Sequence, residues 1–373
     1  MSLNNNISNS SLRFLIAGGG TGGHIFPAIA IANAIKKMEP NAQILFVGAK
    51  GKMEMDKVPQ AGYNIKGLDI AGFNRSSLLK NISLPFKLIK SFWQVRNIVN
   101  EFKPTAAIGV GGYSSFPVLK LCQSKGIKTF IHESNSFAGK SNIMLGKNAT
   151  KIFVASDGME KFFPKGKIMI TGNPVRKSIV DSKVDRKDAT AFFNLNSNKK
   201  TVLIVGGSLG AKSINEAIAK DLNEFIKNDI QLIWQTGKTT AEHFIAIAKD
   251  KKGIWINAFI EKMEMAYAAA DVVISRSGAM SVAELCVAKK PTVFVPFPFA
   301  AEDHQTANAQ SLVNKNAAVL IKDENAKMDL VNTTIALANN VSAQQTMRDA
   351  IAKFAIVNAD EIIAKEIILN VEQ

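Results

Sequence analysis

The sequence has only two cysteines and no long uninterrupted run of hydrophobic residues. Cys122 and Cys286 lie far apart in helix-like segments, so the chain has neither a Cys-x-x-Cys pair nor a disulfide framework, and a reducing compartment is expected. No stretch approaches the ~18 continuous apolar residues that a membrane-spanning helix requires. Residues 1–12 are rich in Asn and Ser and lack the apolar core of a secretion signal, so we expect a disordered tail there.

Several motifs of metal and nucleic-acid chemistry are also missing. The chain has no Asp-x-Asp pair, no His-Glu-x-x-His sequence and no Gly-x-Ser-x-Gly elbow, and nothing in it requires a metal ion or a cofactor. It shows no zinc-ligand spacing, helix-turn-helix pattern or aromatic RNA-binding signature, which argues against a nucleic-acid partner. The formal net charge is +15, which fits either an ordinary basic surface or binding to anionic lipid or a phosphorylated substrate.

Short apolar, β-branched segments alternate with helix-length segments along all 373 residues. Continuous apolar strands between helices are typical of parallel sheets that are covered on both faces, so the fold class is α/β, doubly wound. The strands are expected at 13–17, 43–47, 106–110, 128–131, 151–154, 201–205, 230–234, 254–257, 272–275 and 292–295.

The two halves of the chain begin with the same design, which predicts two Rossmann-like domains. Residues 13–24 and 201–212 each run from an apolar strand through a glycine turn into a helix. A polar, charged stretch over 177–200 lies between them, so we expect an N-terminal domain over 13–176 and a C-terminal domain over 177–355. Because ligands of such sheets bind outside the carboxyl ends of the strands, two facing domains would enclose a shared cleft.

The stretch from Gly18 to His24 is the most informative one in the chain. It follows the apolar run 13–17 and precedes a helix-like run that begins near Pro27. Glycine permits close approach of the backbone, and the start of a helix offers unpaired N–H groups and the positive end of a dipole. A phosphate is therefore the expected guest, and His24 is the residue there that can act as a base.

The same glycines also satisfy the dinucleotide fingerprint G-x-G-x-x-G. That fingerprint requires an acidic residue at the end of the second strand to hold a ribose hydroxyl, whereas the strand expected at 43–47 is followed by Gly48. A P-loop is excluded because no Gly-Lys-Ser/Thr follows the turn. A dehydrogenase thus remains an alternative that lacks its confirming residue.

Histidine is scarce, so the position of each one is informative. His24, His132 and His304 fall at expected strand-to-helix loops, whereas His243 lies in a helix-like run and is expected on the surface. A single loop histidine is more often structural than catalytic, but the glycine context distinguishes His24 from the others.

Polar residues after other strands would join the same edge of the sheets. The turn Gly111-Gly112-Tyr113 provides either a second phosphate site or simply a tight turn. Arg176, at the domain junction, can reach a diphosphate. Glu284, one turn into the helix after the strand at 272–275, can accept two ribose hydroxyls, and its alternative role is a favourable interaction with the helix dipole.

Residues 68–99 form a basic, aromatic and amphipathic stretch that differs from the rest of the chain. Such a stretch can lie in a lipid interface, and each basic residue near an anionic bilayer contributes about 1 kcal/mol. The alternative is a helix that packs on its own sheet. The candidate membrane-contact residues are Leu79, Phe86, Lys87, Lys90, Phe92 and Trp93.

Seven short motifs, in this order over residues 13–310, resemble those of the MurG family of bacterial glycosyltransferases, which have the two-domain GT-B fold. Each motif alone is weakly specific, whereas all seven in order are strongly specific. They are Gly18–His24, Gly111–Ser114, His132–Asn135, Gly172–Arg176, Gly206–Ala211, Ser275–Ala279 and Asp303–Gln305.

The resemblance implies an inverting, metal-independent transfer of N-acetylglucosamine in peptidoglycan synthesis, and hence a role in cell shape and division. The donor would be UDP-N-acetylglucosamine. The acceptor would be the C4 hydroxyl of N-acetylmuramyl-(pentapeptide)-pyrophosphoryl-undecaprenol, so that lipid I becomes lipid II. The resemblance also implies a peripheral protein on the cytoplasmic face of the inner membrane, with an anionic lipid surface and cell-wall synthesis proteins as candidate partners. A C-terminal helix within 356–373 would return to the first domain.

The resemblance also assigns residues, with His24 as the base. The acceptor pyrophosphate would lie against Gly20, Gly111, Gly112 and Tyr113. The donor would contact Thr21, Gly22, Gly23, Asn135, Arg176, Ser208, Ile260, Gly278, Ala279, Met280, Ser281, Val282, Ala283, Glu284 and Gln305. The chain departs from the family at Ser134 and Leu209, where glutamine is common, and Met280–Ala283 varies the usual Leu-Thr-Val-Ser.

Three readings remain beside the family assignment. The chain could be another GT-B enzyme with a soluble acceptor, a UDP-sugar epimerase of the same fold, or a catalytically silent nucleotide-sugar-binding or membrane-scaffold protein. Liposome binding, product analysis without acceptor, and transfer to a lipid I analogue distinguish these readings.

Overall fold

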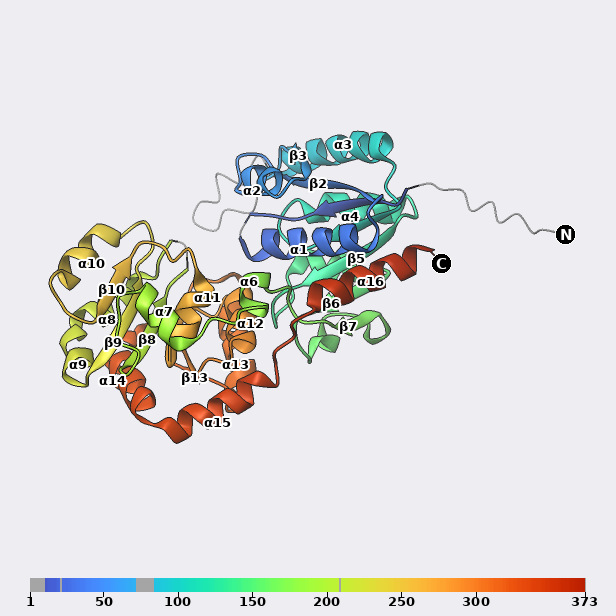
Figure 1. Cartoon of the computed structure of the whole chain (residues 1–373). Helices are drawn as coiled ribbons and strands as arrows, with labels where there is room; N and C mark the ends of the chain where they lie inside the picture. The colour runs from blue at the N-terminus through green and yellow to red at the C-terminus, as the bar shows by residue number, and fades with distance from the viewer. Residues whose placement is uncertain (1–10, 21, 72–83, 208, 373) are drawn as a thin grey trace. The chain divides into compact units, whose positions relative to one another are not determined.

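The computed structural model describes residues 11–20, 22–71, 84–207 and 209–372 (Figure 1). The chain divides into two compact units. The first unit contains the chain up to Ser134, then Ala138–Pro174, and finally the segment from Asn358 onward. The second unit contains Asn135–Phe137 and Val175–Val357.

The first unit is built on a seven-stranded parallel sheet with the order β3-β2-β1-β4-β5-β6-β7. Because the order reverses between β1 and β4, these two strands form the switch point at which such sheets bind ligands. The strands are β1 (Arg13–Ala17), β2 (Gln43–Ala49), β3 (Asn64–Leu68), β4 (Ala106–Gly109), β5 (Lys128–Glu133), β6 (Lys151–Val154) and β7 (Ile168–Ile170).

Helices cover both faces of this sheet. Successive side chains of a strand point to opposite faces, so Phe14 and Ile16 of β1 lie in a different core from Leu15 and Ala17. The helices of this unit are α1 (Gly22–Met38), α2 (Glu54–Gln60), α3 (Leu84–Phe102), α4 (Ser115–Ser124), α5 (Lys140–Gly146) and α16 (Ala359–Glu372), with the short turns η2 (Met159–Lys161) and η3 (Lys165–Lys167).

The last helix of the chain belongs to the first unit. Ile363 and Ile367 of α16 are fully buried in the same core as Ile31 and Ile35 of α1. The two helices lie side by side (Figure 1). The unit is therefore completed by a segment that follows the whole second unit in the sequence.

The second unit is built on a six-stranded parallel sheet with the order β10-β9-β8-β11-β12-β13. This is the order of the first six strands of the other sheet, so the switch point lies between β8 and β11. The strands are β8 (Lys200–Val205), β9 (Ile230–Gln235), β10 (Ile254–Asn257), β11 (Val272–Ser275), β12 (Thr292–Phe294) and β13 (Val319–Leu320).

This sheet is also covered on both faces, because Val202 and Ile204 of β8 lie in one core and Leu203 lies in the other. The helices are α6 (Lys177–Val180), α7 (Arg186–Phe192), α8 (Lys212–Lys220), α9 (Leu222–Lys227), α10 (Ala241–Ala248), α11 (Met263–Ala269), α12 (Ala279–Val287), α13 (His304–Val313), α14 (Ala326–Asn339) and α15 (Val341–Ala352), with the turns η4 (Ala301–Asp303) and η5 (Asp323–Asn325).

The predicted α/β, doubly wound class is confirmed, and the sequence analysis missed β3, β7 and β13. All three are edge strands. An edge strand is paired on one side only, so it is short or mixed in polarity, as in Asn64–Leu68, and lacks the continuous apolar run of a central strand. No helix among the described residues is long and apolar enough to cross a bilayer.

Candidate active site

The two glycine turns of the first unit form one structure at the switch point of its sheet. Ala17 at the end of β1 is in register with Gly109 at the end of β4. The Gly19 N–H donates to the Gly111 carbonyl over 3.3 Å. The Ser115 hydroxyl lies 2.8 Å from the carbonyl oxygens of both Ala17 and Gly111. The sequence predicted two separate turns, whereas the parallel register joins them.

His24 lies in the first turn of α1, and its ring is oriented by the backbone. The His24 Nδ1 is 3.0 Å from the Gly19 carbonyl oxygen. A carbonyl oxygen can only accept, so Nδ1 carries the hydrogen and Nε2 carries the lone pair. A Cβ atom at Gly111 would lie 2.8 Å from His24 Nε2. Because Gly111 has no side chain, there is room beside it for Nε2 of the His24 ring.

The N–H groups of the first glycine turn point into the protein. The Gly18 N–H donates to the Val47 carbonyl over 3.3 Å, and the Gly19 N–H donates to Gly111. The Gly20 N–H donates to the Glu54 carboxylate over 2.9 Å. An anion at this turn would instead have to use the amides of the first turn of α1, which lack intrahelical partners. The arrangement also disfavours a dinucleotide, whose pyrophosphate would need the amides of the turn.

Glu54 was not identified by the sequence analysis. It is the first residue of α2 and is 1% exposed. One carboxylate oxygen accepts the N–H of Gly20 and the other accepts the N–H of Ala49 over 3.0 Å. In the sequence it resembles an ordinary acidic residue in the first turn of a surface helix, so no local signal indicates its burial.

His132 was expected in a loop, but β5 continues to Glu133 and the ring is fully buried. Its Nε2 is 3.4 Å from the Gly172 carbonyl oxygen. Burial lowers the pKa of His132 to about 4, the hydrogen bond to Gly172 acts in the opposite direction, and the nearby His24 lowers it further. His132 is therefore neutral near pH 7. Tyr113 is half-exposed beside the second glycine turn.

In the second unit, the described donor candidates follow β10, β11 and β12, apart from Asn135 and Arg176. Gly278 caps α12, and Met280–Ala283 are half-buried in its first turns. Ile260 is buried, and its N–H donates to Gln235 over 3.2 Å. The Gln235 side-chain amide in turn donates to the Gly207 carbonyl over 3.0 Å. Thr21, Ser208 and Leu79 lie outside the described residues.

Arg176 and Glu284 form a bidentate ion pair. The Arg176 Nε and Nη2 donate to the two Glu284 carboxylate oxygens over 2.8 and 2.9 Å. The Tyr267 hydroxyl donates to Glu284 Oε2 over 3.1 Å. Burial raises the pKa of Tyr267 well above its ordinary value, and the adjacent carboxylate raises it further, so the phenol keeps its proton. A nucleotide sugar that binds to Arg176 and Glu284 must therefore replace the contacts that these two side chains make with each other. The sequence analysis did not identify Tyr267.

Asn308 connects the other predicted donor residues. Its side-chain amide nitrogen lies 3.1 Å from the Ser277 carbonyl oxygen and 3.2 Å from Asn135 Oδ1. Its amide oxygen accepts the Ser136 N–H over 2.8 Å. The Ser277 hydroxyl donates to the Gln305 carbonyl over 2.8 Å. Asn135, the turn before α12 and Gln305 are thus brought together by a residue that the sequence analysis assigned no role.

Arg276 holds this turn in place. Its Nη1 donates to the carbonyl oxygens of Val295 and Pro296 over 2.9 Å and also pairs with Asp323. The guanidinium lies 5.5 Å from the centre of the Phe297 ring. It therefore ties the end of β11 to the segment after β12, which leads to Gln305.

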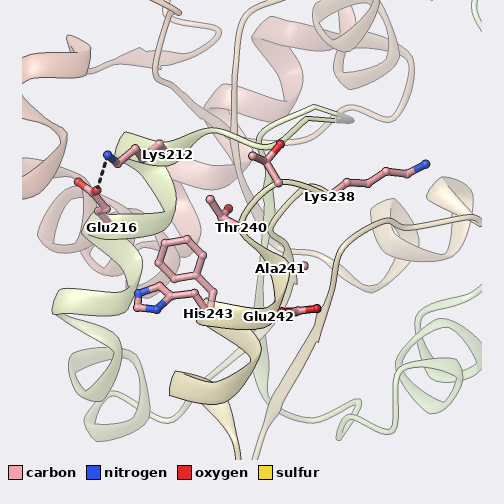
Figure 2. A pocket seen from close by; sticks show the side chains of 9 residues that line it. Lys212, Glu216, Lys238, Thr240, Ala241, Glu242 and His243 are labelled. Carbon is pink, nitrogen blue, oxygen red and sulfur yellow. Dashed lines mark ion pairs between the residues drawn. The ribbon is translucent and has the colours of Figure 1, made fainter.

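A separate cavity of about 580 Å³ lies in the second unit beside α8 and α10 (Figure 2). Lys212 and Glu216 form an ion pair at its edge over 3.7 Å. His243 lies on an exposed part of α10, as the sequence predicted. None of the predicted site residues lines this cavity. The cavity is lined by Lys212, Glu216 and Lys238–Phe244.

Helix α3 presents two apolar faces. Val95, Ile98 and Val99 are buried against the sheet, whereas Phe86 and Trp93 are 74% and 66% exposed. The packing of α3 on its own sheet is confirmed, and the exposed apolar face leaves contact with a lipid interface as a prediction. Lys87 is exposed, and Lys90 is exposed and pairs with Asp69 over 2.8 Å.

Phe92, a candidate membrane-contact residue, does not lie on the exposed apolar face of α3. Its ring is half-buried and packs edge-on against Phe116, with the ring centres 6.5 Å apart. One residue of difference along a helix rotates the side chain by about 100°, which turns Phe92 away from the exposed face that carries Trp93.

Comparison with known proteins identifies relatives along almost the whole chain. Residues 14–154 match the glycosyltransferase family 28 N-terminal domain, and residues 201–363 match the family 28 C-terminal domain. A relative from Phocaeicola vulgatus is 50% identical over 360 residues, which is 96% of each chain. A relative from Parabacteroides distasonis is 49% identical over 363 residues, covering 97% of this chain and 99% of the other. Both are named UDP-N-acetylglucosamine--N-acetylmuramyl-(pentapeptide) pyrophosphoryl-undecaprenol N-acetylglucosamine transferase.

The crystal structure of Acinetobacter baumannii MurG superimposes with a TM-score of 0.77 at 28% identity, covering 96% of this chain and 100% of that one. Two doubly wound units, each with a glycine turn and a helix N-terminus at its switch point, define a nucleotide-sugar glycosyltransferase of the GT-B class. The chain belongs to glycosyltransferase family 28 and, within it, to the MurG family.

Proposed function

We propose that this protein transfers N-acetylglucosamine from UDP-N-acetylglucosamine to N-acetylmuramyl-(pentapeptide)-pyrophosphoryl-undecaprenol, the conversion of lipid I into lipid II in peptidoglycan synthesis. The observation that carries this proposal is identity of 45–50% over nearly the full chain with bacterial enzymes named for the same transfer. The acceptor atom is the C4 hydroxyl of the N-acetylmuramyl residue.

The second unit binds the donor. Glu284, held by Tyr267 and Arg176, accepts the ribose hydroxyls once Arg176 turns to the diphosphate. A planar guanidinium suits a phosphate as well as a carboxylate, so this exchange replaces one bidentate partner by another. The turn before α12 and Gln305, which Ser277 and Asn308 hold together, complete the donor contacts.

His24 is the base in a single inverting displacement. The acceptor hydroxyl oxygen forms a bond to the anomeric carbon while the bond from that carbon to the UDP oxygen breaks. The hydroxyl proton passes to His24 Nε2, and UDP departs with the electron pair. The contact between His24 Nδ1 and the Gly19 carbonyl supports this role, because it leaves the lone pair on Nε2.

The negative charge of the two diphosphates is met without a metal ion. Neither α1, α8 nor α12 has an acidic residue in its first turn, so each N-terminus favours an anion. Arg176 adds a positive charge for the departing UDP. The acceptor pyrophosphate lies against the Gly111-Gly112-Tyr113 turn and the first turn of α1.

The protein works peripherally at the cytoplasmic face of the inner membrane. The exposed apolar face of α3 and its lysines support this location, because an aromatic and basic surface binds an anionic lipid interface. Such binding would place the first unit where the undecaprenyl chain of the acceptor lies. Cell-wall synthesis proteins are the expected protein partners.

The test is turnover of a lipid I analogue by the His24→Ala variant. We expect kcat to fall by about 10²–10⁴-fold, the usual contribution of a positioned base, while calorimetry shows unchanged UDP-N-acetylglucosamine binding. His243→Ala, which changes an exposed histidine of α10, is the matched control and should keep full activity.

Near-normal turnover by His24→Ala with intact donor binding would eliminate His24 as the base. Product formation from UDP-N-acetylglucosamine without any acceptor would instead favour an epimerase. Transfer to a soluble acceptor in preference to the lipid I analogue would favour another GT-B transferase.

A further inference from the structure

Glu54 is a buried carboxylate beside the glycine turns of the first unit, and the proposed reaction leaves it without a role. Its side chain enters from α2 and reaches the turn after β1. Its two oxygens accept two backbone N–H groups, from Gly20 and Ala49. A buried carboxylate is costly unless it is hydrogen-bonded in this way, so its presence at the turn calls for an explanation.

The peptide between Gly19 and Gly20 links this carboxylate to His24. The N–H of that peptide, which belongs to Gly20, donates to Glu54 Oε2 over 2.9 Å. The carbonyl of the same peptide, which belongs to Gly19, accepts from His24 Nδ1 over 3.0 Å. In a planar trans peptide the N–H and the C=O point in opposite directions. Glu54 and the imidazole therefore lie on opposite ends of one rigid group.

We propose that Glu54 is a positioning residue for the base and acts on His24 through the Gly19–Gly20 peptide. This inference rests on the proposed function of His24. The carboxylate fixes the orientation of the peptide plane, and the carbonyl then fixes the tautomer and the direction of the imidazole ring. Hydrogen bonds in such a chain polarise one another, so the carboxylate also strengthens the carbonyl as an acceptor.

The arrangement performs the task of the carboxylate in a carboxylate–histidine pair, with a peptide inserted between the two groups. No proton moves along this series of hydrogen bonds. The acceptor hydroxyl proton goes to His24 Nε2, and Nδ1 keeps its hydrogen throughout. The imidazolium that forms donates more strongly to the Gly19 carbonyl, so the carboxylate stabilises the charge that develops during transfer.

The glycines around Glu54 make room for it. A Cβ atom at Gly19 would lie 2.2 Å from Glu54 Oε1, and one at Gly48 would lie 2.5 Å from Glu54 Cγ. With a side chain at either position, Glu54 would have to move from its place beside the turn. Gly48, near the end of β2, where a dinucleotide-binding fold carries its acidic residue, therefore gives access to a carboxylate from α2 that faces the turn.

His132, from β5, interacts electrostatically with His24, but burial keeps its ring neutral at neutral pH. Asp56 lies on the same helix as Glu54 and is exposed. It forms no side-chain contact with the glycine turn in the described part of the chain, which makes it a matched control for loss of one negative charge from α2.

The experiment is a double-mutant cycle with Glu54→Gln and His24→Ala, measured with a lipid I analogue and UDP-N-acetylglucosamine. For Glu54→Gln we expect kcat to fall by about 10-fold or more, as when a group that orients a histidine is removed, and KM for the donor to stay within about 2-fold. The acid limb of the kcat profile should move to lower pH, because the imidazolium loses a stabilising charge. In the His24→Ala background, Glu54→Gln should have no further effect.

Asp56→Asn should leave kcat and the pH profile unchanged. The inference is overturned if Glu54→Gln keeps normal turnover, or if Glu54→Gln lowers kcat by the same factor in the His24→Ala background. It is also overturned if Asp56→Asn shifts the pH profile of kcat as much as Glu54→Gln does. Histidine nitrogen NMR of the unmodified protein tests the geometry even if Glu54→Gln does not fold. It should show hydrogen on Nδ1 of His24, and hydrogen on Nε2 would refute the arrangement. Failure of the base assignment is seen separately, as normal turnover by His24→Ala alone.

Discussion

His132 shows how one buried side chain makes stability depend on pH. Its ring is fully buried, and burial lowers its pKa to about 4, whereas a histidine in the unfolded chain titrates near 6.5. Between these two values the unfolded state binds more protons than the folded state, so stability falls as the pH falls through this window.

We therefore expect the free energy of unfolding to decrease by about 2 kcal/mol between pH 7 and pH 5 through His132 alone. Urea unfolding at the two pH values measures the change. His132→Asn should remove this part of the pH dependence, whereas His243→Gln, at an exposed position, should keep it. An unchanged pH dependence in His132→Asn would show that another group is responsible.

In the second unit, Glu284 is oriented by two neighbouring side chains. Glu284 is 7% exposed, and its oxygens are shared by Arg176 and Tyr267. A carboxylate in this position is already oriented before a ligand arrives, which reduces the ordering that binding requires. In the proposed function, the donor replaces the contacts that Arg176 and Glu284 make with each other.

Among the helices, α3 combines a structural face with an exposed apolar face. Phe86, Ile89 and Trp93 follow the i, i+3, i+7 spacing and are all exposed, whereas Val95 and Val99 are buried. Complete burial of each aromatic side chain would contribute about 1.5–3 kcal/mol, so even partial insertion into lipid is measurable.

We expect the double change Phe86→Ser and Trp93→Ser to weaken binding to anionic phospholipid vesicles by about 10-fold or more. Sedimentation with the vesicles measures the binding, and added salt should weaken that of the unmodified protein because its lysines contribute. The control is Phe299→Ser, which removes an 81% exposed aromatic residue of the second unit. Equal binding by all three proteins would exclude α3 as the membrane contact.

At the scale of the whole molecule, the chain consists of two units with the same strand order, and the predicted donor contacts are concentrated in the second. A ligand that binds only the folded state stabilises it by an amount set by its concentration relative to Kd. Ligand binding should therefore be visible as protection in one unit rather than along the whole chain.

We expect UDP at 100 times its Kd to stabilise the protein by about 2.7 kcal/mol, and EDTA to leave this stabilisation unchanged. Hydrogen exchange should show added protection at the segment from β11 to α12 and around Gln305. Arg176→Ala should reduce the effect while the exposed control Lys227→Ala preserves it. Loss of UDP binding in EDTA would show that a metal ion is required.

The sequence alone determined the elements whose signals are local. Central strands such as 13–17 and 201–205 are apolar because both faces of the sheet are covered, and each glycine turn stands directly between a strand and a helix. These features depend on residues that are neighbours in the chain, so the class of fold, the family and the position of His24 could be predicted.

Only the tertiary structure decided which distant groups meet. Glu54 reaches Gly20 across 34 positions, Arg176 reaches Glu284 across 108, and Asn308 reaches Asn135 across 173. The parallel register of the strands brings such groups to one edge, and burial then selects which partner each takes. The sequence analysis therefore named His24 without Glu54 and Glu284 without Tyr267. The periodicity of the sequence does not predict a hydrogen bond between remote residues, because such a bond depends on how whole helices and strands pack and not on neighbours along the chain.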